Sequence, residues 1–162
     1  MSTFEREDHR WRETFFVVFD EERRPTAERM RAALSGLGHR YEVENLRGDD
    51  AGMFSSVTLR SPEDYSAIDI SYAFGAEIVD EGRNLAEEIQ SMDADDLEIE
   101  KIGRLRDCPA RFDVLHFEKV EGDASEDEVG DMLDPSALLL VMETLALLTE
   151  GVGVDPQSGT VM

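Results

Sequence analysis

Short apolar runs with the period of a β-strand alternate with helical patterns along the first third of this chain. The run TFFVVFD at 14–20 is aromatic and β-branched, which is typical of a buried central strand. Apolar residues of 27–37 then recur at intervals of three and four, which predicts an amphipathic helix. Pro25 suits the start of that helix and Gly38 its end.

The middle of the chain predicts three further strands and a second helix. Alternation of apolar and polar residues places strands at 41–46, 54–60 and 67–74. After Gly75 the period changes to that of a helix, which we expect over 76–91.

The last third is predicted to hold two strands, an acidic loop, an apolar helix and two short strands. In chain order these segments are 98–105, 112–120, 121–134, 135–149, 152–154 and 160–162. The helix 135–149 is apolar on nearly all sides, which is typical of a helix buried in a core. Asp134 and Pro135 suit its cap and its first turn.

This order of elements predicts an α+β fold, with a mostly antiparallel sheet and three helices. An opening β-α-β unit followed by hairpins favours a ferredoxin-like topology with additions. A length of 162 residues is typical of one domain. We expect residues 1–12 to form a polar tail and residues 13–162 to form that domain.

The net charge of -22 at pH 7 is unevenly distributed along the chain. Residues 1–47 are almost neutral, and the acidic excess lies in residues 48–162. Such a charge argues against direct binding to nucleic acid or to anionic membranes, because both are polyanions. Two explanations remain open: a solubility or salt adaptation of the whole protein, or a surface that recognises a basic protein partner.

Three features of the sequence predict a cytoplasmic location. The single cysteine, Cys108, allows no intrachain disulfide, which fits a reducing compartment. Residues 1–12 lack the apolar stretch of a secretory signal. The most apolar run, 137–148, is too short to cross a bilayer core of about 30 Å.

Candidate catalytic residues are few. Cys108, Asp113 and His116 lie close together in sequence, but a strand places Asp113 and His116 on opposite faces because their separation is odd. No G-x-S-x-G or phosphate-binding motif is present. The sequence therefore favours a protein that is not an enzyme, and it predicts no cofactor.

Metal binding is also weakly indicated. The three histidines are scattered, and no zinc-binding pattern occurs. The loop 123–134 matches several ligand positions of a calcium-binding loop, but Glu128 occupies the position that requires glycine. We therefore predict no specific metal site.

Two surfaces are candidates for binding. The first is acidic and would engage a basic protein; its residues are Glu77, Asp80, Glu81, Glu88, Asp123, Glu126, Asp127 and Glu128. The second is a dispersed site for a small ligand or for a small enzyme's substrate; its residues are Arg24, Arg31, Tyr72, Asp113 and His116. A homodimer stays open, because strand edges and the apolar C-terminal helix could be covered by a second copy.

The closing segment carries a short resemblance. The apolar helix followed by GVGVDPQSGT at 151–160 resembles the C-terminal end of small bacterial α+β domains of unknown function. Some of those domains are grouped with immunity-type proteins of toxin systems. The resemblance implies a bacterial cytoplasmic domain with a binding role, for which toxin neutralisation is one concrete form.

Overall fold

An antiparallel β-sheet organises the chain in a computed structural model, which describes residues 9–37, 41–61, 66–90, 96–119, 135–156 and 160–161. The strands are β1 (His9–Phe19), β2 (Glu42–Gly48), β3 (Phe54–Ser61), β4 (Ser66–Phe74), β5 (Ala110–Lys119), β6 (Val152–Asp155) and β7 (Thr160–Val161). Within these described segments they form one seven-stranded sheet in the order β2-β3-β4-β5-β1-β6-β7. Every pair of neighbours is antiparallel.

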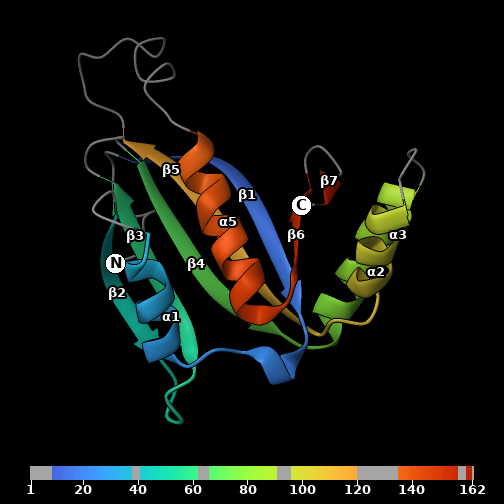
Figure 1. Ribbon diagram of the computed structural model, residues 1–162, viewed down its shortest axis with the longest axis horizontal. Coiled ribbons are helices and arrows are strands. Elements are labelled where there is room, and N and C mark those ends of the chain that lie inside the picture. Colours follow the sequence, from blue (N-terminus) through green and yellow to red (C-terminus); the bar gives the residue numbers. More distant parts are fainter. Residues whose placement is uncertain are drawn as a thin grey trace.

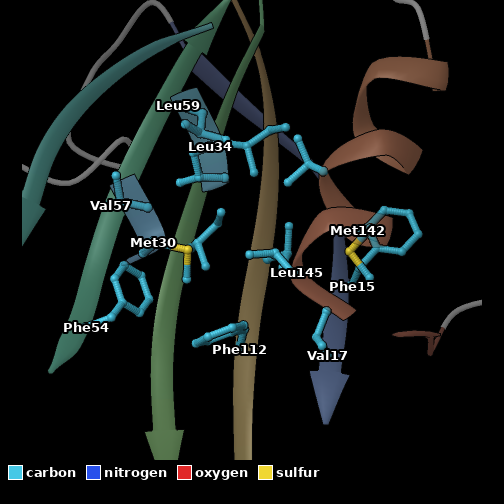
Figure 2. Close-up of a cluster of buried hydrophobic side chains, with 14 of the residues drawn as sticks. Phe15, Val17, Met30, Leu34, Phe54, Val57, Leu59, Phe112, Met142 and Leu145 are labelled. Atoms are coloured by element: carbon cyan, nitrogen blue, oxygen red, sulfur yellow. The ribbon is translucent and has the colours of Figure 1, made fainter. Parts of the chain in front are cut away.

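Two helices cover one face of this sheet. They are α1 (Ala27–Ser35) and α5 (Pro135–Thr149), which lie side by side in front of the strands in Figure 1. Thr26 caps α1 by accepting a hydrogen bond from the backbone N–H of Arg29 at 3.1 Å. Met30 of α1 and Met142 of α5 point into a core that also receives side chains from the sheet (Figure 2).

The main core depends on strand alternation. Phe15, Val17 and Phe19 of β1 point towards α1 and α5, together with Phe112 of β5 and Phe54 of β3. Phe112 meets the ring of Phe19 at 4.6 Å between centroids and the ring of Phe54 edge-on at 5.4 Å. These aromatic contacts join the two halves of the sheet beneath the helices.

A second, smaller core lies on the other side of β1. Val18 points there, and so do Val152 and Val154 of β6. Two helices, α2 (Ala76–Gln90) and α3 (Asp96–Leu105), close this core with Ala86, Ile102 and Leu105. A helical turn, the 3₁₀ segment η2 (Glu21–Arg23), connects β1 to α1.

The predicted α+β class and the antiparallel sheet are confirmed. The ferredoxin-like topology is not confirmed: α1 connects β1 to β2, but three strands, β3, β4 and β5, lie between them in the sheet. The described residues contain four α-helices instead of the three that we expected.

The helix that we did not expect is α3. Residues 98–105 were expected to form a strand, but they belong to α3. Ile102 and Leu105 are both buried at a spacing of three, while Ile99 is 51% exposed, which is the pattern of a helix with one buried side.

The first strand begins earlier than expected, within the predicted polar tail 1–12. β1 begins at His9 and pairs with β5 from His9 opposite Lys119 to Phe19 opposite Ala110. Backbone pairing with β5 thus extends the strand through a polar stretch that shows no alternation. α1 ends at Ser35 with Gly36 as its C-terminal cap, so the predicted helix end at Gly38 is wrong. The predicted loop 121–134 lies outside the described residues.

None of the described helices combines the length and the apolar character that crossing a membrane requires.

Candidate functional site

The helix α2 presents a row of carboxylates on its outward side. Ile78, Gly82 and Ala86 are buried along its inward side, as the predicted amphipathic pattern requires. On the outward side Glu77, Asp80, Glu87 and Glu88 are exposed. Of the expected partner-binding residues, the structure thus brings Glu77, Asp80 and Glu88 onto one helix face.

Glu81 has a different role from its neighbours on α2. Its carboxylate accepts a hydrogen bond from Nη1 of Arg111, a β5 residue that is only 9% exposed. Nε of the same guanidinium donates to Oδ1 of Asp113 at 2.6 Å, and its carbon lies 4.2 Å from the ring centroid of Phe16. Arg111 therefore fixes α2 to the sheet through Glu81.

The remaining predicted partner-binding residues lie outside the described part of the chain. These residues are Asp123, Glu126, Asp127 and Glu128. The acidic character of the α2–α3 segment is nevertheless clear from the sequence, because residues 76–107 contain eleven acidic residues and four basic ones.

Arg24 and Tyr72 are the two members of the alternative ligand site that the structure brings together. The guanidinium carbon of Arg24 lies 3.9 Å from the centroid of the Tyr72 ring. Nε and Nη2 of Arg24 donate to the carbonyl oxygen of Phe54 at 3.0 and 2.7 Å, and Nη1 lies 3.2 Å from Oδ2 of Asp49. Burial raises the pKa of Tyr72. Most donors of Arg24 are thus engaged within the protein.

The partner of Arg24, Asp49, organises a turn before β3. The backbone N–H groups of Ala51 and Met53 donate to its Oδ1 at 2.9 and 3.0 Å. The bond from Met53, with smaller contributions from Ala51 and Arg24, holds the pKa of Asp49 below its ordinary value. Arg24, which follows η2, therefore connects this turn and the ring of Tyr72 in β4 through contacts within the protein.

The other three members of the alternative site lie elsewhere. Arg31 is exposed on α1. Asp113 bonds to Arg111 on the α2 side of β5, whereas His116 is buried on the opposite face, as the odd spacing predicted. The structure does not assemble these five residues into one site.

Cys108 is not placed to act as a nucleophile. It is buried in the second core, and this burial raises the pKa of its thiol. A protonated, inaccessible thiol reacts slowly. Among the residues that the structure describes, no group of three or more His, Cys, Asp and Glu side chains could hold a metal ion.

A groove that the sequence did not predict runs between α3 and α5. Its volume is about 490 Å³, and its walls carry Lys101 and Arg104 from α3 and an apolar strip from α5. The full lining is Lys101, Arg104, Leu139, Met142, Glu143, Ala146, Leu147, Glu150, Gly151 and Gly153. The signal for it was the apolar character of residues 135–149 on nearly all sides, but we interpreted that pattern as a largely buried helix.

Glu150 belongs to the lining of this groove. It follows α5 in a left-handed conformation with φ of 51°, and its carbonyl oxygen accepts a hydrogen bond from Nη2 of Arg104. Its carboxylate lies 2.7 Å from Nη2 of Arg23. The end of α5 is thereby joined both to α3 and to η2.

Comparison of the chain with protein-family models, with curated proteins and with solved structures finds no significant match.

Proposed function

We propose that this protein is a non-catalytic binding module that engages a basic protein partner through the acidic face of α2. We define this acidic face by its four exposed carboxylates, Glu77, Asp80, Glu87 and Glu88. The observation that carries the proposal is their display on a helix that Arg111 fixes to the sheet through Glu81. A fixed helix can hold several charges in one orientation towards a partner.

Electrostatic steering is the proposed mechanism. Carboxylates gathered on one side of an acidic protein attract a cationic surface, speed its encounter and orient it before close contact. Neutralisation of a basic toxin by a bacterial immunity-type protein is one concrete form of this function. The single cysteine supports a reducing compartment such as the cytoplasm.

The alternative function, a small enzyme or a small-ligand binder, has less support. Arg24 is engaged by Phe54 and Asp49, and Asp113 and His116 lie on opposite faces of β5. The α3–α5 groove has a volume in the range of small-molecule sites, which is the one observation in favour of this alternative.

The proposal is tested by removing the charge of the acidic face without changing side-chain size. The variant carries Glu77→Gln, Asp80→Asn, Glu87→Gln and Glu88→Gln. The probe is a fluorescently labelled basic peptide composed of lysine and glutamine, called the Lys/Gln peptide. The affinity of the variant for this peptide is measured by fluorescence anisotropy at low salt. We expect the dissociation constant to rise at least about tenfold relative to the unsubstituted protein.

A charge-matched variant separates the acidic face from the net charge. It carries Glu21→Gln, Glu22→Gln, Glu28→Gln and Glu42→Gln, which are all exposed positions away from α2. We expect its affinity to fall no more than about threefold. Equal losses in the two variants would overturn the proposal, because binding would then depend on net charge alone.

A further inference from the structure

The helix α5 leaves one side of an almost wholly apolar sequence uncovered by the described chain. Leu139, Leu140 and Leu147 are 49%, 45% and 74% exposed. Glu143 is the one charged residue between Pro135 and Thr149. A helix that is apolar on all sides is ordinarily covered on all sides. The exposed leucines therefore indicate a surface that another polypeptide covers.

The α3–α5 groove lies directly beside these leucines, and Leu139 and Leu147 belong to its lining. Figure 1 shows β6 between α5 and the helix pair α2 and α3. In β6 the side chains of Val152 and Val154 belong to the second core, so Gly153 faces the opposite way and adds no side chain to the groove. An exposed apolar knob and an open groove thus occur side by side on one surface.

The two walls of the groove carry opposite charges. Lys101 and Arg104 lie on the α3 wall, and Glu143 and Glu150 lie on the α5 wall. Arg104 donates a hydrogen bond to the carbonyl oxygen of Glu150, and the carboxylate of Glu150 pairs with Arg23. Within the described residues, Lys101 and Glu143 form no ion pair. Within this part of the chain, Lys101 on one wall and Glu143 on the other are therefore available to a partner.

This arrangement is complementary to itself. A two-fold axis along the groove places the α3 wall of one copy opposite the α5 wall of the other. Lys101 of each copy then faces Glu143 of the other, and each Leu147 faces the open groove of its neighbour. A groove with walls of the same charge would not have this property.

We propose that a second copy of this chain covers the α3–α5 groove in a two-fold symmetric dimer. Leu147 of each copy enters the groove of the other, and Lys101 pairs with Glu143 across the interface. This interface is separate from the acidic face of α2, so it does not depend on the proposed binding of a basic partner.

The net charge of -22 gives this dimer a distinctive response to salt. Two acidic copies repel each other at long range, and a Debye length of about 8 Å at physiological ionic strength screens that repulsion. Dimerisation therefore strengthens as salt rises from a low level. Binding of a basic partner to the acidic face responds in the opposite direction, so the two interactions can be told apart.

Sedimentation velocity over a range of protein concentrations tests the proposal. For the full chain we expect a reversible monomer–dimer equilibrium that shifts towards dimer as salt is added. Leu147→Gln should weaken dimerisation at least about tenfold. The control Phe74→Gln replaces an exposed apolar side chain of β4, away from α5 and outside the groove lining, and should change the dimerisation constant less than about twofold.

Charge reversal provides the second arm. Lys101→Glu and Glu143→Lys should each weaken dimerisation, and the double variant, whose net charge equals that of the original chain, should restore it. Glu143→Lys is the sharper single variant, since it lowers the net negative charge and would strengthen association if only long-range repulsion mattered. A chain that stays monomeric at all concentrations and salt levels would overturn the proposal, as would a dimer that neither Leu147→Gln nor charge reversal weakens.

Discussion

At Gly82 the contact between α2 and α3 leaves no room for a side chain. A Cβ built on this residue would overlap the carbonyl oxygen of Leu105, and it is backbone that would have to move. We therefore expect Gly82→Ala to lower the free energy of unfolding by about 1–3 kcal/mol, as overpacking does in well-packed cores. Urea unfolding followed by circular dichroism measures this change.

Gly103 provides the matched control on the facing helix. A Cβ built there meets nothing within 4 Å. Gly103→Ala should therefore raise the free energy of unfolding by up to about 1 kcal/mol, because alanine is the better helix former. If both substitutions stabilise the protein, that result would contradict the claim that α2 and α3 leave no room for a side chain at Gly82.

Asp49 predicts a specific pH dependence of stability. Its folded pKa lies below its ordinary value of 3.8, so its ionised carboxylate stabilises the fold fully above that value. The contribution is lost as the pH falls through the lowered folded pKa. Asp49→Asn should therefore be less stable than the original protein near neutral pH, and the difference should shrink as the pH falls from about 5 to about 3.

Asp50→Asn, at the next exposed position of the same turn, controls for the general effect of removing a carboxylate. Denaturant titrations at a series of pH values give the comparison. A stability difference for Asp49→Asn that stays constant down to pH 3 would contradict the role given to its hydrogen bonds with Ala51 and Met53.

Among the secondary-structure elements, the pattern of apolar residues predicted the strands and three of the four described helices. The strands of the main sheet and the helices α1, α2 and α5 were confirmed within the described residues. Residues 98–105 were misassigned because only Ile102 and Leu105 of α3 are buried and Ile99 is exposed, so the apolar pattern there was ambiguous. The order of strands could not be predicted, since it depends on long-range pairing such as that of β1 with both β5 and β6.

The candidate site was predicted only in part, for a related reason. The helical period identified the outward carboxylates of α2, and it placed Glu81 among them. It could not show that Glu81 meets Arg111, which is 30 residues away in sequence. The α3–α5 groove depends in the same way on how two distant helices flank β6.

Substitution of Arg111 tests whether this residue holds α2 against the sheet. Arg111→Met keeps an apolar stem over Phe16 but removes the donors to Glu81 and Asp113. We expect the free energy of unfolding to fall by about 1–3 kcal/mol, because two carboxylates lose their partner. Amide hydrogen exchange should quicken in α2 more than in α5. Unchanged exchange in α2 would show that Arg111 does not hold this helix.

For the whole molecule, the structure shows how the nearly neutral first third meets the acidic remainder. Arg23 pairs with Glu150, and Arg24 pairs with Asp49. Part of the charge asymmetry is therefore internal pairing around η2. The exposed carboxylates of α2 do not take part in these pairs, which leaves a predominantly negative surface on that helix.

The most direct test of the proposed function is the association rate of the Lys/Gln peptide as a function of ionic strength, measured by stopped-flow fluorescence. Steering by the acidic face predicts a rate constant that falls steeply with added salt. The slope should be shallower when Glu77, Asp80, Glu87 and Glu88 are neutralised, and steep in the charge-matched variant. A slope that both sets of substitutions reduce equally, or an association rate that does not depend on salt, would contradict the account.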